Sequence, residues 1–414
     1  MRFVYYVLTI GVIFSCTPEK EKITAPIEEI PEKASFISSL ASDSANLWWA
    51  RTLVDVDGDG ILDVALHDNN GYGGWLGYLK GRIDGELWET VIVAMESPNG
   101  KKFAAGDLDA GDIDGDGDND LIGVEHPGEW EDAEADAVLF WYEQSENGWI
   151  THNVGSIPSA LKDISLSDLN GDGLPEIITV TYNAETLTIF NRDKDKLDFK
   201  KIWETKLDNL HEGMDVGDVN GDGAVDIAAN GYLLVNQGGD LTSWETQVID
   251  SMWFNQEEDH WARNATKHVC KDVDGDGQAE VFISHSEKTS YPVARYDLNA
   301  DGSWNKQILL DSIPAAHSLV VADMDLDGSD DVLTGVNRSR AINIMEELAL
   351  ELDLKDFPVY LLRNTGDQWK TEIINSQGVY NLLAGDLEGD GDIDLIRLST
   401  HDGNDMHVLV NQLR

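Results

Sequence analysis

A nine-residue acidic pattern that occurs seven times is the feature that most constrains the fold of this chain. Its copies are DVDGDGILD from Asp55, DIDGDGDND from Asp112, DLNGDGLPE from Asp168, DVNGDGAVD from Asp218, DVDGDGQAE from Asp272, DMDLDGSDD from Asp323 and DLEGDGDID from Asp386. The first residues of successive copies lie 50 to 63 positions apart, and a period of this length is typical of repeat architectures. We therefore expect one repeat domain rather than several unrelated domains.

Each copy places oxygen-bearing side chains at its positions 1, 3, 5 and 9, and a glycine at position 6. This is the order of the first nine positions of an EF-hand loop, in which alternate side chains converge on calcium and the glycine permits a sharp turn. The glutamate of EF-hand position 12 is missing, and the flanking residues predict strands rather than helices. The pattern thus favours calcium loops between strands. Simple Asx turns are the alternative, but crowded carboxylates without a cation would repel one another.

Apolar stretches around each copy predict four short strands per unit. Around the sixth copy these stretches read SLVVAD, DVLTGV, VYLLRN and WKTEII. Four short strands in about fifty residues are typical of one blade of a β-propeller. The sequence therefore predicts an all-β fold, a seven-bladed β-propeller of four-stranded blades. One insertion, INIMEELALELDL from Ile342, has a helical pattern, and we expect it to pack as a cap on its own blade.

The two ends of the repeat region complement each other. The last unit ends at MHVLVNQLR and lacks a fourth strand, whereas the run SFISSLA from Ser35 stands before the first unit without a partner. Pairing these two segments would close the ring and leave no exposed sheet edge. We therefore expect an N-terminal strand to complete the seventh blade.

The first 33 residues carry signals for export. Arg2 precedes an apolar run from Phe3 to Phe14, which is too short to span a bilayer and has the proportions of a signal-peptide core. The residues IFSC, which end at Cys16, resemble a bacterial lipobox, in which the cysteine is lipidated after cleavage. An ordinary signal peptide cut nearby is the alternative. The expected organisation is a signal peptide over 1–16 ending at lipidated Cys16, a Pro- and charge-rich flexible tether over 17–33, and the propeller over 34–414.

The strongly acidic composition limits the partners of this chain. Its formal net charge of −49, from 78 acidic and 29 basic residues, repels phosphate backbones and anionic membranes. We therefore expect no nucleic-acid partner, and contact with a membrane only through the lipid anchor. A hydrophobic content of 42% supplies enough apolar area for a folded core. The expected state is a monomer in the bacterial cell envelope, as an outer-membrane lipoprotein facing the periplasm or the surface.

The acidic loops and their flanking strands resemble the FG-GAP and VCBS repeat family, which includes the propeller of integrin alpha chains. The resemblance extends over about residues 34 to 414. It implies up to seven structural calcium ions, each in a loop that joins the first and second strands of a blade. The ligands it implies are Asp55, Asp57, Asp59, Asp63, Asp112, Asp114, Asp116, Asp120, Asp168, Asn170, Asp172, Glu176, Asp218, Asn220, Asp222, Asp226, Asp272, Asp274, Asp276, Glu280, Asp323, Asp325, Asp327, Asp331, Asp386, Glu388, Asp390 and Asp394. Three loops depart from the pattern through Pro175, Leu326 and the long Glu388.

A ligand site is expected on the face opposite the acidic loops. Most of the ten histidines, several of the scarce basic residues and the longest insertions fall in or beside the connections of that face. Propellers bind ligands at the mouth of the central funnel, where the innermost strands begin. The candidate residues for this site are His211, His268, His285, His317, Arg263, Arg338 and Tyr291.

Two functions remain open for that face. One is a non-enzymatic surface module that binds a glycan or a protein. The other is a polysaccharide lyase or dehydratase, in which a cation neutralises a uronate carboxylate while histidine or tyrosine abstracts the adjacent proton. A transition metal on clustered histidines could play the part of that cation. The absence of HExxH, GxSxG and P-loop motifs favours the binding module. An enzyme would need several of the candidate histidines within reach of one substrate.

Overall fold

The computed structural model describes residues 35–43, 49, 51–68, 73–125, 135–192, 196–256, 262–347, 357–366, 368–398 and 405–412. The predicted signal peptide, Cys16 and the tether lie outside the described residues. The chain divides into two compact units, Met1–Glu32 and Lys33–Arg414, and the described residues all belong to the second. In the described part of the chain, no helix is both long and apolar enough to cross a membrane.

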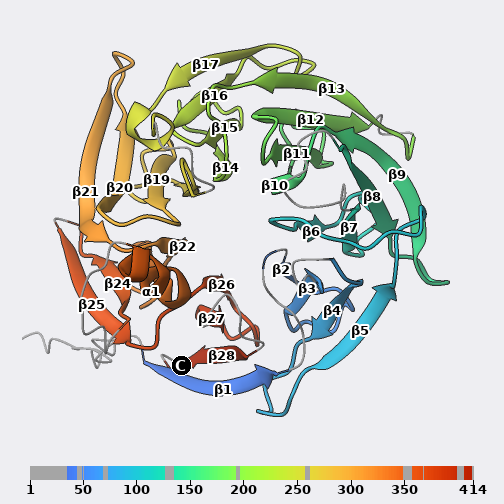
Figure 1. Ribbon diagram of the computed structural model, residues 1–414, viewed down its shortest axis with the longest axis horizontal. Helices are drawn as coiled ribbons and strands as arrows, with labels where there is room; N and C mark the ends of the chain where they lie inside the picture. Colours follow the sequence, from blue (N-terminus) through green and yellow to red (C-terminus); the bar gives the residue numbers. More distant parts are fainter. Residues whose placement is uncertain are drawn as a thin grey trace, which may run out of the picture. The chain divides into compact units, whose positions relative to one another are not determined.

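Residues of the second unit form seven four-stranded antiparallel sheets arranged in a ring, which confirms the predicted seven-bladed β-propeller (Figure 1). From the inner to the outer strand, blades 1 to 3 are β2 (Arg51–Val54), β3 (Asp63–His67), β4 (Leu76–Lys80) and β5 (Glu89–Ala94); β6 (Ala110–Gly111), β7 (Asp120–Glu125), β8 (Ala137–Glu143) and β9 (Ile150–Ile157); β10 (Leu161–Ser167), β11 (Glu176–Thr181), β12 (Thr186–Arg192) and β13 (Phe199–Lys206). Blades 4 and 5 are β14 (Met214–Gly217), β15 (Asp226–Ala229), β16 (Tyr232–Asn236) and β17 (Trp244–Val248); β18 (Thr266–Lys271), β19 (Glu280–His285), β20 (Tyr291–Leu298) and β21 (Trp304–Ile313). Blades 6 and 7 are β22 (Ala316–Ala322), β23 (Asp331–Val336), β24 (Val359–Asn364) and β25 (Trp369–Asn375); β26 (Asn381–Gly385), β27 (Asp394–Leu398), β28 (Met406–Asn411) and β1 (Phe36–Ser42).

The ring is closed by the two ends of the propeller sequence. Strand β1 pairs antiparallel with β28, from Phe36 opposite Asn411 to Ser42 opposite Met406. In Figure 1, β1 is accordingly the outermost strand of the blade that holds β26 to β28. The predicted closure by an N-terminal strand is confirmed, and the seventh blade has its full four strands.

The apolar core lies between neighbouring blades. Strands β3, β7, β11, β19 and β23 are buried along their whole length, because each is the second strand of a sheet that is covered on both faces. Trp141, Phe103 and Phe190 are among the largest fully buried side chains, and they belong to one apolar cluster that spans blades 1 to 3. Aromatic rings of this size bury much apolar area each, so this packing fixes the blades against one another.

A short helix, α1 (Arg338–Glu347), follows β23 in blade 6. Asn337 caps it, since its side-chain oxygen accepts the backbone N–H of Arg340 at 3.2 Å. Ala341 and Ile344 are buried, and Ala341 packs in the same cluster as Phe357. The expected cap on its own blade is thus confirmed, although the helix begins four residues before Ile342 because Asn337 supplies the cap.

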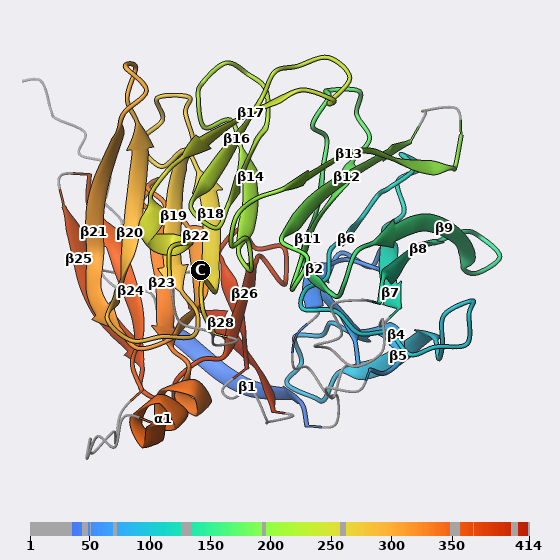
Figure 2. The same cartoon turned by 45° about the horizontal axis from the view of Figure 1, so that its top comes forward.

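The strand order places the acidic loops at one end of the propeller axis and the starts of the inner strands at the other end. Within each blade the strands run alternately up and down, so all seven connections from first to second strand lie at one axial end. The inner strands begin at the other end, where α1 also lies (Figure 2). The residues of the two predicted sites therefore lie at opposite ends of the ring.

Candidate functional site

The first aspartate of each acidic loop organises the loop backbone. In blade 1, Asp55 Oδ1 accepts the N–H of Gly58 at 2.8 Å, and Oδ2 accepts the N–H of Gly60 at 2.9 Å. Both glycines have positive φ angles, which side chains with a Cβ rarely adopt. The bond from the position-6 glycine N–H to Oδ2 recurs at Asp112, Asp168, Asp218, Asp272, Asp323 and Asp386. In blade 6, Leu326 keeps a positive φ of 58° at the position where the other loops have glycine.

The carboxylate at position 9 connects three strands. Asp63 Oδ2 accepts the N–H of Val56 at 2.8 Å, and Oδ1 accepts the N–H of Gly81 at 2.7 Å. Burial raises the pKa of Asp63 to about 6, and that of Asp120 to about 7 in blade 2. Burial thus disfavours the ionised form of these carboxylates, and a cation held beside them would offset that penalty. These residues therefore fit a cation while they also hold the blade together.

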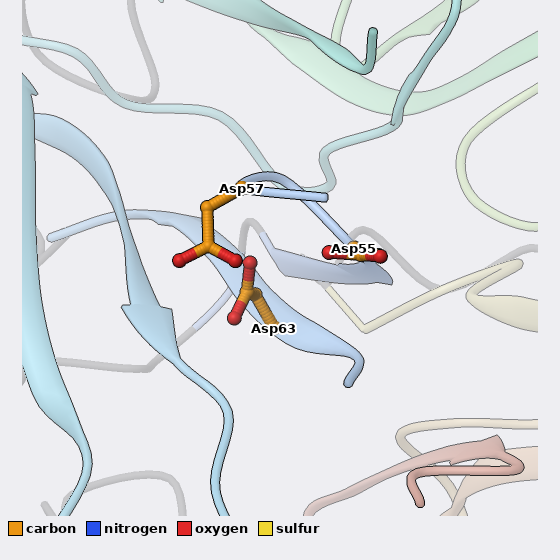
Figure 3. A group of neighbouring side chains, drawn as sticks. All are labelled: Asp55, Asp57 and Asp63. Carbon is orange, nitrogen blue, oxygen red and sulfur yellow. The ribbon is translucent and has the colours of Figure 1, made fainter. Parts of the chain in front are cut away.

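Four loops bring carboxylates close enough to share one ion. Three side chains in each offer oxygens that all lie within 4.8 Å of one another (Figure 3 shows the first group). The four groups are Asp55, Asp57 and Asp63; Asp112, Asp114 and Asp120; Asp272, Asp274 and Asp276; and Asp323, Asp325 and Asp327. Oxygens that each lie 2.3–2.6 Å from calcium can be up to about 5 Å apart, so the spacing fits. Asp57 Oδ1 and Glu388 Oε2 are also buried without a hydrogen-bond partner among the described residues.

Basic side chains from the third strands reach three of these loops, which the sequence analysis did not predict. In blade 1, Lys80 pairs with Asp57 and lies 2.9 Å from Asp59. Arg295 Nη2 lies 2.9 Å from Asp274 and 3.0 Å from Glu280 in blade 5, and Arg363 pairs with Asp325 in blade 6. Among the described residues, no ion pair reaches the predicted ligands of blades 2 and 4.

At the other axial end, every blade contributes a polar side chain at or just before the start of its inner strand. We call these residues the axial cluster: Arg51, Asp107, Lys162, Glu212, Lys267, His317 and Tyr380. Glu212 is only 2% exposed and lies 2.8 Å from Lys162 and 2.9 Å from Lys267, whose side chains are 21% and 25% exposed. Burial alone would raise the pKa of Glu212, but the two lysines outweigh it and hold that pKa well below its usual range.

A second acidic residue adjoins the axial cluster. Glu287 is buried, with its carboxylate oxygens 3.4 Å from Arg340 Nε and 3.4 Å from His317 Nε2. Burial raises the pKa of Glu287 to about 8 and lowers the pKa of His317 well below its usual range. The His317 ring lies 4.4 Å from that of Tyr380, and its Nδ1 has no hydrogen-bond partner among the described residues. The neutral imidazole of His317 therefore contacts the aromatic ring of Tyr380 and the carboxylate of Glu287.

The predicted candidates divide into two groups. His211 and His317 both lie close enough to Glu212 to lower its pKa, so they belong with the axial cluster. His285 is also within electrostatic reach of Glu212 and His211, but its ring packs against that of Tyr291 at 4.3 Å and its Nε2 bonds to the side chain of Gln256. Burial lowers the pKa of His285 to about 3, which keeps that ring uncharged.

The remaining candidates are not part of the cluster. His268 is buried beside Thr266, and burial lowers its pKa to about 3. Arg338 lies over the ring of Phe357, and Arg263 forms no ion pair with the part of the chain that the structure describes. The sequence analysis missed Glu212 and Glu287. The residues of the axial cluster lie four to six positions before the first aspartate of each loop, and this offset would have indicated Glu212. The sequence could not show its contacts, because the two lysines come from other blades.

Comparisons with known proteins agree with this architecture. An FG-GAP-like repeat matches residues 168–229 and 272–334, so the chain contains such repeats in two places. Among curated proteins, no sequence matches this chain significantly. The fold is similar to an Agrocybe aegerita lectin that recognises non-reducing terminal N-acetylglucosamine, with a TM-score of 0.51, 15% identity, and coverage of 90% of this chain and 86% of the lectin.

Two further solved structures share the fold. Saccharomyces cerevisiae Sqt1 has a TM-score of 0.51 and 10% identity over 91% of this chain and 99% of its own. BBS1N, solved in complex with ARL6DN, has a TM-score of 0.51 and 11% identity over 91% of this chain and 97% of its own. At such low identity these likenesses support the propeller fold alone.

Proposed function

We propose that this chain is an exported, lipid-anchored and calcium-binding β-propeller that binds an extracellular glycan or protein at the axial cluster. The observation that carries the proposal is the convergence of seven polar side chains, one per blade, on the end opposite the acidic loops. Buried ionic groups are weak contributors to stability, and their gathering at one place is typical of functional sites. The proposed role of the propeller is to present that site outside the cytoplasm.

Calcium has a structural part in this proposal. The aspartates at positions 1, 3 and 5 and the acidic residue at position 9 would hold the ion, as the spacing of the group Asp112, Asp114 and Asp120 allows. The ion would neutralise carboxylates that otherwise repel one another. Its binding would tie the connection between the first two strands of a blade to the rest of the sheet.

A glycan is the first ligand class to test. The side chains of Lys162 and Lys267 are partly exposed, and each ammonium group has three N–H donors and one carboxylate within ion-pair distance, so each can donate further hydrogen bonds. The similar fold of a lectin that recognises terminal N-acetylglucosamine supports the choice of carbohydrate probes. The first 33 residues support an extracellular setting for such a ligand.

The test is binding of the purified chain to an array of defined glycans, with Lys267→Met compared to the wild type. We expect Lys267→Met to weaken binding by about tenfold or more, because a charge-assisted hydrogen bond is lost. Lys206→Met is the matched control, since Lys206 pairs with Glu185 and is 63% exposed. Thermal unfolding confirms that each variant folds. Equal binding by Lys267→Met and wild type would place the ligand site elsewhere.

A lyase is the second candidate, favoured by the neutral His317 beside Tyr380 and cationic Arg51. In that reaction a cationic side chain would neutralise the uronate carboxylate while histidine or tyrosine takes the proton from the adjacent carbon. The electrons of that C–H bond form a C=C bond, and the neighbouring C–O bond to the leaving sugar breaks. Incubation with alginate, pectate and heparan sulfate, followed by ultraviolet absorbance of the unsaturated product, tests it. No absorbance change with any substrate would exclude lyase activity on these polysaccharides and leave binding as the function.

A further inference from the structure

The acidic loops differ in the residue that the third strand places opposite position 9. In blade 1 the pairing of β3 with β4 puts Lys80 opposite Asp63, one step beyond the last paired residues. In blade 6 the pairing of β23 with β24 puts Arg363 opposite Asp331 in the same way. Both basic side chains turn to carboxylates of their own loop. The same structural position thus supplies an internal cation twice.

Blades 2 and 4 have no such cation at this position. In blade 2 the residue opposite Asp120 is Glu143, which is held by His152 at 2.6 Å. In blade 4 the residue opposite Asp226 is the apolar Val235. The carboxylates of the blade 2 loop nevertheless lie as close together as those of blade 1. Crowded carboxylates that have no positive side chain beside them favour the binding of a cation from solution.

In blade 5, a basic side chain at a different position of the third strand also contacts the carboxylates of the acidic loop. Arg295 lies earlier in the third strand, opposite Phe282, and its guanidinium reaches both Asp274 and Glu280. Arg295 also contacts Asp297 at 2.6 Å, so it neutralises carboxylates on the second strand, β19, and on its own strand, β20. An arginine with five donors in a rigid fork suits such multiple contacts.

We propose that the basic side chains of blades 1, 5 and 6 occupy the place that calcium takes in blade 2, so that these three loops bind no calcium at concentrations that fill the blade 2 loop. The inference rests on the calcium binding proposed above. A lysine or arginine that is part of the fold has a high local concentration at its loop. Calcium would have to displace it and leave an uncompensated positive charge beside the bound ion.

The experiment exchanges the facing residues of blades 1 and 2. The wild-type chain is dialysed against calcium, and its bound metal is measured by elemental analysis and by titration calorimetry. Seven loops less the three with basic partners leave at most four ions per chain. Lys80→Glu should add one ion, and Glu143→Lys should remove one. Lys80→Met adds one ion without new negative charge, and Lys206→Met, on an exposed pair, should leave the number unchanged.

The outcomes separate this inference from the proposed function. Seven ions in the wild type, or no change in either exchanged variant, would overturn the inference while calcium binding stands. A chain that binds no calcium at all would overturn both. A crystal structure of the wild type grown with calcium gives a test that needs no variant: we expect an ion in blade 2, and an ion in blade 1, 5 or 6 would refute the assignment.

Discussion

The two axial ends of the propeller accommodate charge in opposite ways. At the loop end the charges are nearly all negative, lie close in sequence, and accept hydrogen bonds from their own loop backbone, as Asp55 does. At the other end, charges of both signs come from different blades, as in the contacts of Glu212 with Lys162 and Lys267. The first arrangement is complete within one blade. The second exists only after the ring has assembled, so the two ends should respond differently to mutation, calcium and pH.

The largest expected effect is at the axial cluster. Glu212→Gln would leave two lysines without their buried counter-charge, and we expect the free energy of unfolding to fall by about 3–5 kcal/mol. Urea denaturation in calcium measures it. Glu185→Gln, which disturbs the partly exposed pair of Glu185 with Lys206, is the control. A loss below about 1 kcal/mol would mean that solvent already screens these lysines.

A smaller effect, dependent on calcium, is expected at the loop end. Asp114→Ala removes a predicted ligand from blade 2, and with calcium at ten to a hundred times its dissociation constant the lost ion costs about 1.4–2.7 kcal/mol. In EGTA the variant and wild type should unfold alike. Asp57→Ala in blade 1 is the comparison, because Lys80 occupies that loop and calcium should not alter its effect. If calcium changed the stability of both variants equally, the proposed difference in calcium binding between the loops of blades 1 and 2 would be wrong.

One separable part of the pH dependence should come from His67, at the end opposite the loops. Burial lowers the pKa of His67 to about 4 from an ordinary 6.5, so the unfolded chain takes up a proton first as pH falls. The stability that neutral His67 contributes is present above pH 6.5 and is lost between there and about pH 4. Wild type should therefore lose roughly 1 kcal/mol more than His67→Phe between about pH 7 and about pH 5.5. Parallel stability curves for the two proteins would show that this ring titrates normally.

The smallest effect is expected away from both ends. Lys201 pairs with Glu204 on the exposed outer strand β13 at 2.8 Å. Lys201→Met should change the free energy of unfolding by only about 0.2–1 kcal/mol, since both side chains are solvated. Chemical denaturation gives this baseline, and a larger change would mean that the outer strands are not independent of the axial contacts.

What the sequence could predict follows from how local each feature is. The seven acidic loops, the strands around them and the pairing of β1 with β28 rest on short patterns and on one unpaired segment, and the structure confirms the ring. The candidate site was predicted only in part. His317 could be located because histidines are few, whereas Glu212 is one of many acidic residues and gains its environment from lysines in two other blades.

The structure differs from the sequence-based predictions at two further residues, Arg338 and Lys80, and each difference has a physical reason. Arg338 carries the right charge for the axial end, but the helix that begins there directs it to the ring of Phe357. The contact of Lys80 with its loop depends on the register of a third strand, which no pattern inside the nine-residue copy contains. Features that cross strands or blades thus require the assembled sheet.

The pairing of β1 with β28 also bears on how the protein folds. It joins the first strand of the propeller to the last, so the ring has no closed form until the final residues are available. Contacts between the most distant segments of a chain carry the largest loop-closure entropy, and such topologies fold slowly. During synthesis, the first six blades can each pair internally, whereas the seventh cannot form until both β1 and β26 to β28 are available. Completion of the last blade should therefore be the slow kinetic step, with β26 to β28 the segment most exposed to proteases and chaperones before it.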